Sequence, residues 1–140
     1  MQQHIITPYV GVGPLKFGMT RADAHKILGA PLSSKKSRFS DESKDFWDEN
    51  GLQLTFSGGD EKLLEISLYP NLPDVELNGL KLFAVPGADA FRALSALDTA
   101  PLTRAGTTIF LKLGLAVGGF LHSDESDKSV TAFAKGRWDE

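Results

Sequence analysis

The sequence predicts an α+β fold made of two tandem repeats, each a short helix followed by a three- to four-stranded antiparallel sheet, joined into one domain over residues 1–140. Three observations predict it. A motif near residue 22 recurs near residue 88, each copy lies on a helical pattern, and each is followed by segments in which apolar and polar residues alternate. With 140 residues, 41% of them hydrophobic and 24% charged, the chain has the length and composition of an ordinary globular domain.

The recurring motif reads Ala-Asp-Ala-x-basic-x-Leu, if His25-Lys26 and Phe91-Arg92 are aligned at its centre. In both places Leu-Lys precedes it and Ala-Pro-Leu follows it. This agreement in order and spacing predicts a duplication, with repeat one at about residues 11–70 and repeat two at about residues 75–138. Because a solenoid needs three or more stacked units, the two copies are expected to pair into a single domain.

The first helix is predicted over residues 21–28. Thr20 is a favourable N-cap, and Asp23 stands where a capping box places its acidic residue. Gly29 suits the end of the helix, and Pro31 prevents its extension. The side expected to be buried consists of Ala24, Ile27 and Leu28.

The second helix is predicted over residues 87–97. Pro86 suits the start of a helix because its fixed φ angle is already helical. Apolar residues recur at helical spacing and define the side expected to be buried: Ala90, Phe91, Leu94 and Leu97.

The segments after each helix have the period-two pattern of half-buried strands. In the first half, residues 52–57 and 64–68 flank the turn sequence Ser-Gly-Gly-Asp and predict a hairpin. A preceding strand over residues 45–49 is expected, since Asn50-Gly51 is a strong turn signal. Residues 70–74 are the expected connector, and the second-half strands are expected at 108–112, 115–121 and 130–135.

Charged residues cluster in two places that predict a contact surface for a partner protein. A basic stretch, Lys35, Lys36 and Arg38, is followed at once by an acidic segment that includes an aromatic pair, and a second acidic turn follows residue 122. Carboxylates speed association with a basic partner, and aromatic side chains supply affinity. The alternative is that both segments are simply solvated turns and hairpin tips. The candidate contact residues are Asp41, Glu42, Asp45, Trp47, Asp48, Glu49, Asp124, Glu125 and Asp127.

The composition argues against several classes of function. The absence of cysteine excludes a disulfide scaffold, a thiolate zinc site and a cysteine nucleophile. A net charge of −3 argues against nucleic acid as the main partner. The N-terminus does not read as a signal peptide, and the apolar run 109–121 is too short and too interrupted to span a bilayer, so we expect a cytoplasmic protein with no membrane partner.

Catalytic and cofactor motifs are weak. The histidines His4, His25 and His122 do not have the spacing of metal ligands, and His25 is expected at the surface or edge of its helix. Residues 122–124 read His-Ser-Asp, but catalytic triads are assembled in space, so adjacency is no evidence for one. We therefore expect no catalytic residues, no metal and no cofactor.

Residues 11–31 resemble the opening of two groups of small bacterial domains. The stretch reads Gly-x-Gly-x-hydrophobic-x-hydrophobic-Gly-Met-Thr, followed by a short helix that ends in Leu-Gly-x-Pro. One group has the fold shared by the beta-lactamase inhibitor protein and the outer-membrane assembly lipoproteins. The other is similar to cytoplasmic immunity proteins of bacterial toxin systems. The resemblance implies a tandem repeat whose joined sheet forms a binding face.

The departures from the first group favour the second. Assembly lipoproteins need a signal peptide and a lipid-bearing cysteine, and the inhibitor is secreted and disulfide-bonded. The resemblance therefore implies an immunity protein that binds and neutralises a cognate toxin or effector domain by occluding its active site. The alternatives are a non-catalytic peptide- or small-ligand-binding or assembly module, and a small metal-dependent hydrolase. Whether an exposed edge strand produces a homo-oligomer stays open.

Overall fold

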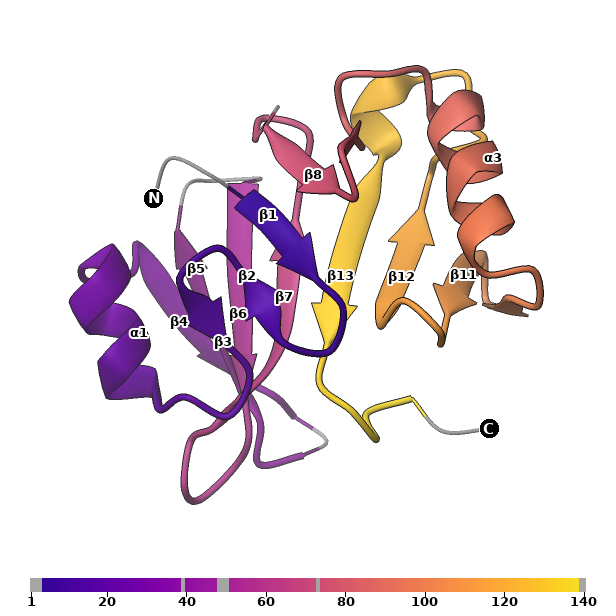
Figure 1. The fold of residues 1–140 in the computed structure, drawn as a ribbon. Coiled ribbons are helices and arrows are strands. Elements are labelled where there is room, and N and C mark those ends of the chain that lie inside the picture. The colour runs from indigo at the N-terminus through magenta and orange to yellow at the C-terminus, as the bar shows by residue number, and fades with distance from the viewer. Residues whose placement is uncertain (1–3, 39, 48–50, 73, 139–140) are drawn as a thin grey trace.

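The computed structural model describes residues 4–38, 40–47, 51–72 and 74–138, which form a mixed α+β fold of two helices and two sheets (Figure 1). The large sheet has eight strands in the order β10-β11-β12-β13-β7-β6-β5-β4, and the small sheet has five in the order β3-β2-β1-β8-β9. The elements in chain order are β1 (His4–Thr7), β2 (Gly11–Val12), β3 (Leu15–Lys16), α1 (Arg21–Leu28), β4 (Ser33–Lys36), β5 (Ser43–Trp47), β6 (Leu52–Phe56), β7 (Leu63–Leu68), β8 (Val75–Leu77), β9 (Leu80–Lys81), α3 (Gly87–Leu97), β10 (Leu102–Arg104), β11 (Thr107–Phe110), β12 (Leu115–Gly118), the 3₁₀ turn η1 (Glu125–Asp127) and β13 (Ser129–Phe133).

Helix α1 begins and ends where the sequence predicts. The Thr20 hydroxyl accepts a hydrogen bond from the backbone N–H of Asp23 over 3.2 Å, which satisfies one of the free N–H groups of the first turn. Gly29 ends the helix at a φ of 83°, a left-handed conformation that costs glycine little.

The buried side of α1 is only partly the expected one. Ala24 is buried and Leu28 packs against the core, but Ile27 is 41% exposed. The stripe that faces the sheet runs at i, i+3, i+4 and i+7 from Arg21, and Ile27 lies about 100° away from its neighbour Leu28 on the helix circumference. The sheet-facing stripe therefore includes polar residues, and the expectation for Ile27 is wrong.

Helix α3 has the predicted bounds and packs through Ala90 and Leu94, which are both buried. Pro86 occupies the N-cap position, one residue before the first helical turn. Leu97 was expected on the buried side but is 39% exposed; it lies on the same stripe as Ala90 and Leu94, at the last residue of the helix.

The large sheet joins both halves of the chain. Strands β4 to β7 form one antiparallel run of four neighbours and β10 to β13 form another. The two runs meet at β7 and β13, which pair antiparallel with Leu68 opposite Val130. The expectation that each helix is followed by its own sheet is therefore wrong, since the strands of residues 11–70 and 75–138 share one continuous sheet.

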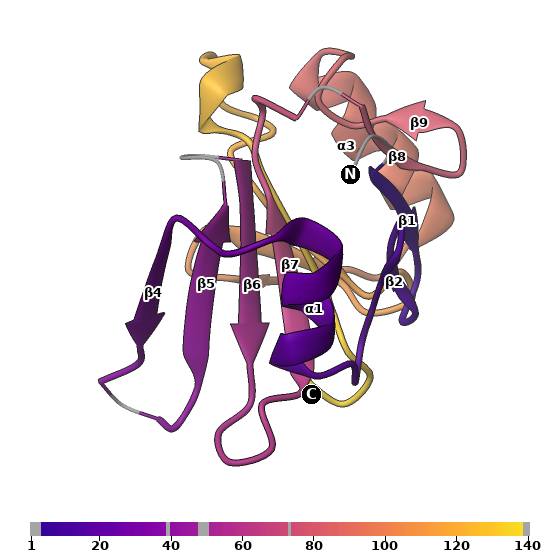
Figure 2. The same ribbon diagram turned by 90° about the vertical axis from the view of Figure 1, so that its left-hand side faces the viewer.

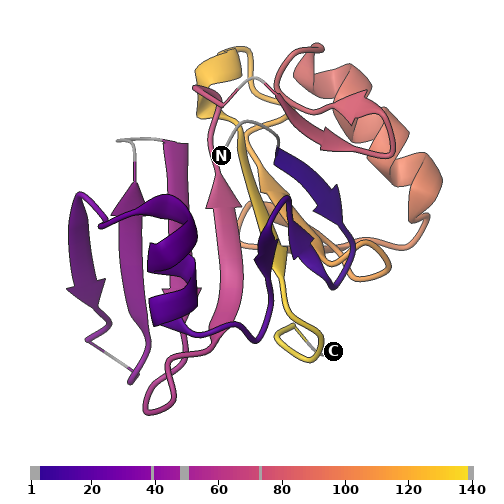
Figure 3. The same ribbon diagram turned by 60° about the vertical axis from the view of Figure 1, so that its left-hand side comes forward.

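Both helices and the small sheet cover the same face of the large sheet. Figure 2 shows β4 to β7 side by side with α1 against them, and Figure 3 shows α1 and the β1–β3 segment in front of the large sheet. In the small sheet β1 pairs parallel with β8 and antiparallel with β2, which brings the start of the chain beside residues 75–81. The main core lies between these layers. Its large-sheet members include Leu54, Phe56, Ile66, Leu68, Leu115, Val117, Val130 and Ala132.

The predicted strands agree with the structure except at their ends. The hairpin of β6 and β7 is confirmed, and so are strands near 108–112, 115–121 and 130–135. Strand β12 ends at Gly118 because the next residue, Gly119, turns the chain at a φ of 72°. The strand expected at 45–49 is β5, which begins two residues earlier. Asp48, Glu49, the Asn50 turn position and Pro73 of the connector lie outside the described residues.

Neither helix of the described chain has the length and apolar character that crossing a membrane requires.

Candidate functional site

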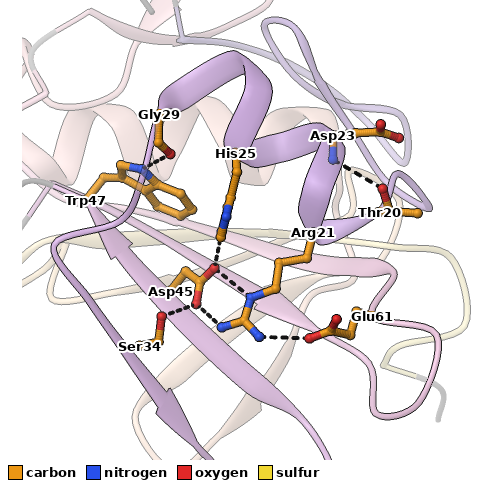
Figure 4. A network of polar contacts seen from close by, with 9 residues as sticks. All are labelled: Thr20, Arg21, Asp23, His25, Gly29, Ser34, Asp45, Trp47 and Glu61. Atoms are coloured by element: carbon orange, nitrogen blue, oxygen red, sulfur yellow. Dashed lines mark hydrogen bonds and ion pairs between the residues drawn. The ribbon is translucent and has the colours of Figure 1, made fainter.

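The most extensively bonded polar cluster in the described chain lies between α1 and the sheet, and we call it the Asp45 network (Figure 4). It comprises Arg21, His25, Ser34, Asp45 and Glu61. Arg21 and His25 are four residues apart on α1, so their side chains lie on one face of the helix, directly over β5. Asp45 stands in the middle of β5, two residues before Trp47, and therefore points to the same covered face as that tryptophan.

The carboxylate of Asp45 accepts hydrogen bonds from three residues. One oxygen, Oδ2, accepts from Arg21 Nε over 2.9 Å and from His25 Nε2 over 2.7 Å. The other, Oδ1, accepts from Ser34 Oγ over 2.7 Å and from Arg21 Nη2. Arg21 extends the network by donating from Nη1 to Glu61 Oε2 over 2.7 Å. The Asp45 side chain is 0% exposed, and its acceptor positions are filled by protein donors.

Opposing effects set the charge state of Asp45. Burial raises the pKa of this carboxyl group. The hydrogen bonds from Arg21, His25 and Ser34, together with the charge of Arg21, lower the pKa by more than burial raises it, so it falls to about 2. The hydrogen bond to Asp45 likewise raises the pKa of Arg21 above its ordinary value. Both groups are therefore charged at neutral pH, and the aspartate is a poor proton acceptor.

The Asp45 network contains serine, histidine and aspartate but not in the order of a catalytic triad. In a triad the histidine stands between the nucleophile and the carboxylate. Here Ser34 and His25 both donate to Asp45, on opposite carboxylate oxygens, and the structure records no bond between them. The carboxylate therefore holds its neighbours in place, and the Ser34 hydroxyl donates to a carboxylate that is a poor proton acceptor.

Trp47 is part of the same packing arrangement rather than a surface group. Its side chain is 9% exposed, and its indole Nε1 donates to the carbonyl oxygen of Gly29 over 3.2 Å. The ring of His25 meets it edge-to-face, with ring centroids 5.6 Å apart. Trp47 and Asp45, both predicted as partner contacts, are thus buried beneath α1, and a partner docking on the surface does not reach them.

Glu42 is held by the end of the chain. Arg137 donates to its carboxylate from both Nη atoms, with Nη2 2.7 Å from Oε1, and from Nε to Glu65 over 2.6 Å. The bonds from Arg137 lower the pKa of Glu42. Its neighbour Asp41 is exposed on the turn between β4 and β5.

The second acidic turn has structural contacts of its own. Asp124 caps η1 by accepting from the backbone N–H of Ser126 over 2.9 Å. Asp127 accepts from His122 Nδ1 over 3.0 Å. Both carboxylates remain exposed.

Glu125 is bound to the start of α3. Its carboxylate accepts from the backbone N–H of Gly87 over 3.1 Å and lies 2.7 Å from the ammonium group of Lys128. Because the first N–H groups of a helix lack partners within it, this carboxylate completes the N-terminus of α3. Glu125, predicted as a partner contact, therefore also has a role in folding.

The two predicted acidic groups lie at opposite ends of the large sheet. The turn that carries Asp41 and Glu42 precedes β5, whose first residue, Ser43, pairs with the last residue of β6. The loop of Asp124 to Asp127 precedes β13, whose first residue, Ser129, lies at the other end, beside the end of β7. The structure does not bring the two groups together into one surface.

Two open hollows flank the hairpin of β4 and β5. One, of about 350 Å³, lies on the side of the Asp45 network and is lined by Arg21, Ser34, Asp41 and Glu61. The other, of about 480 Å³, lies on the uncovered face of the sheet, and we call it the β4–β5 hollow. It is lined by Lys35, Lys36, Arg38, Lys44, Phe46 and Arg137, among others.

A search of the described residues for three or more histidine, cysteine or acidic side chains able to hold a metal ion finds no such group. No protein-family model, curated protein or solved structure matches this chain. The interpretation of its surface therefore depends on geometry and chemistry.

Sequence reasoning identified Asp45 but missed its partners. It placed His25 at the surface or edge of its helix, and His25 is indeed partly exposed, but it did not predict that His25 and Arg21 bind the buried aspartate. A signal was present in the sequence: because Asp45 and Trp47 are two residues apart on a strand, burial of the tryptophan implies burial of the aspartate. A buried carboxylate needs donors, and the helix carries a basic residue and a histidine at a spacing of four.

Proposed function

We propose that this protein is a cytoplasmic, non-catalytic binding protein of the immunity type, which neutralises a bacterial toxin or effector domain by covering its active site. The observation that carries the proposal is the one-sided cover of strands β5 to β7 in the large sheet. Over β11 to β13 the opposite face instead carries a small buried apolar cluster of Ile109, Ala116 and Phe133. Both helices and the small sheet pack on the same face, and the described residues on the opposite face of β5 to β7 include Lys44, Gln53, Glu65 and Ser67, which are exposed or half-buried. A broad, partly polar sheet face suits recognition of another protein.

A duplicated architecture is part of this proposal. A two-stranded hairpin precedes each helix, β2–β3 before α1 and β8–β9 before α3, and four antiparallel strands follow each helix. The matching motifs lie in the first turns of the two helices. This order supports two copies of one unit joined through their last strands, as the resemblance to the beta-lactamase-inhibitor-protein fold implies.

The bonding of the ionisable groups also supports a binding role over a catalytic one. Asp45, Glu42, Glu65 and Glu125 each bond to basic side chains or backbone N–H groups of the same chain. Such pairs stabilise a scaffold and present no free base or nucleophile. The proposed function therefore depends on the shape and charge of the surface.

Co-expression with a toxin tests the proposal directly. A neighbouring gene that encodes a secreted protein with a variable C-terminal domain would supply the candidate toxin, and that domain is then expressed in a bacterial host with and without this protein. We expect restored growth and a stable complex on size-exclusion chromatography. An active-site variant of the toxin that is no longer toxic serves as the binding control. Growth that stays arrested, with no complex formed, would contradict the proposal.

The β4–β5 hollow favours a second candidate function, a module that binds a peptide or small ligand. Its volume of about 480 Å³ lies in the range of small-molecule sites, and Phe46 supplies an apolar wall. Native mass spectrometry of the freshly purified protein distinguishes this function, because a bound ligand adds a discrete mass that disappears on denaturation.

A further inference from the structure

We propose that the β4–β5 hollow is the contact site for the partner, and that it receives a carboxylate-rich segment of a partner protein. This inference deepens the proposed function and rests on it. It reverses the sign of the charge first expected at the interface, since the candidate contacts in the sequence were acidic and the hollow is basic.

The first support is a pair of lysines placed directly opposite each other. In the antiparallel register of β4 and β5, Lys35 faces Lys44, and both line the hollow. Like charges in this position destabilise a sheet. Their repulsion costs the folded sheet free energy, and an anionic ligand bound between them removes it.

The second support is the shortage of nearby anions. The two carboxylates that line the hollow, Glu42 and Glu65, are both bonded to Arg137. Lys35 and Lys44 form no ion pair with any residue in the described part of the chain, and neither do Lys36 and Arg38. The hollow therefore keeps an excess of positive charge in a chain whose net charge is −3.

The lining of the hollow favours a peptide as the occupant. Phe46 offers apolar contact, and the other lining residues are polar or charged. The hollow lies beside β4, which forms one edge of the large sheet, so an extended segment has access along it. Nucleic acid is the less favoured partner because the net negative charge of the protein opposes its dense, extended charge more strongly than that of a short acidic segment.

Binding of a dye-labelled hexaglutamate peptide, followed by fluorescence anisotropy, tests the inference without any toxin. We expect the wild-type protein to bind the peptide, and the affinity to fall as NaCl rises from about 50 to about 300 mM. The double variant Lys35→Glu/Lys44→Glu is expected to lose affinity by about tenfold or more. The matched variant Lys26→Glu/Lys112→Glu changes net charge equally at exposed sites that do not line the hollow, and we expect its affinity to stay within about twofold of wild type.

Three outcomes would overturn the inference: no binding of hexaglutamate, equal losses in the two double variants, or tighter binding of a labelled single-stranded DNA that the hollow variant abolishes. Because all four lysines are exposed, the variants are expected to fold, and Lys35→Gln/Lys44→Gln, with a smaller loss of affinity, provides a second reading without charge reversal. Toxin neutralisation is measured separately, so failure of the peptide assay and failure of the proposed function are distinguishable.

Discussion

The guanidinium group of Arg21 and the carboxylate of Asp45 form a two-point contact, with Arg21 Nε donating to Oδ2 over 2.9 Å and Nη2 donating to Oδ1. The contact joins the first turn of α1 to the middle of β5, the strand beneath the helix. His25 and Ser34 complete the coordination of the same carboxylate. An eight-residue helix buries little apolar surface, so these polar bonds carry much of its attachment.

Replacing Asp45 with alanine is expected to lower the free energy of unfolding by about 2 to 3 kcal/mol, because Arg21 is left charged and partly buried without its partner. Urea denaturation followed by circular dichroism measures the change. The control is Asp41→Ala at an exposed position, which is expected to change stability by less than about 0.5 kcal/mol. Equal effects of the two substitutions would show that the buried network does not attach the helix.

The same carboxylate predicts how stability depends on pH. The pKa of Asp45 falls from 3.8 to about 2 on folding, so its contribution is fully present above the unfolded pKa and is lost as the pH drops through about 2. The wild-type protein should therefore lose about 2 kcal/mol of stability between about pH 5 and about pH 2 from this group. The Asp45→Asn variant lacks the titrating group, and its free energy of unfolding should fall less steeply over that interval. Parallel pH profiles would contradict the assignment.

Much of the fold was predictable because the signals are local. Thr20 and Gly29 bound α1 by capping chemistry, and the alternation in residues 52–57 and 64–68 identifies the central hairpin. The edge strand β4 was missed because its sequence, Ser-Ser-Lys-Lys, has no apolar alternation. Its pairing within the described sheet comes from β5 alone.

The arrangement of the site was less predictable because it depends on contacts between distant parts of the chain. Arg137 binds Glu42 across 95 residues of sequence, and no local pattern indicates that pairing. Conversely, Lys35 and Lys44 are close in sequence, yet the register that places them face to face becomes visible only when β4 is known to be a strand. From the sequence alone, acidic residues such as Glu42 therefore look more available for a partner than they are. Basic residues such as Lys35 and Lys44 look less relevant to partner binding.

Lys128 provides a separate test of a buried polar contact. Its ammonium group donates to the carbonyl oxygens of Val85 over 2.7 Å and Leu82 over 3.3 Å, and lies 5.3 Å from the ring centre of Phe120. Lys128→Met keeps an unbranched side chain, shorter by one atom, but leaves both carbonyl oxygens without this donor. We expect a loss of about 2 to 4 kcal/mol in the free energy of unfolding.

Hydrogen exchange locates the effect of that substitution. Since Lys128 also pairs with Glu125, which binds the Gly87 N–H, amides in the first turn of α3 should exchange faster in Lys128→Met. Lys112→Met, at an exposed lysine, is the control and should leave both stability and exchange unchanged. If exchange at the start of α3 is unaltered in both variants, Lys128 does not stabilise the first turn of that helix.

At Gly87, helix propensity and close packing predict opposite effects of an alanine substitution on stability. Gly87 is the first residue of α3, where alanine is favoured over glycine by about 1 kcal/mol on propensity alone. A Cβ atom at this position, however, would lie 2.1 Å from the carbonyl oxygen of Phe120, which is backbone and cannot rotate away. Gly87→Ala is therefore expected to destabilise the protein by about 2 to 3 kcal/mol, measured by thermal and urea unfolding, because the loop before η1 must move.

The matched control is Gly59→Ala. Gly59 has a φ of 72° and open space around its Cβ position, so alanine there is expected to cost only about 1 kcal/mol, from backbone strain without any steric conflict. A Gly87→Ala variant as stable as the wild type, or more stable, would mean that propensity outweighs packing at this position and that the loop carrying Phe120 does not pack as closely on the start of α3 as the structure places it.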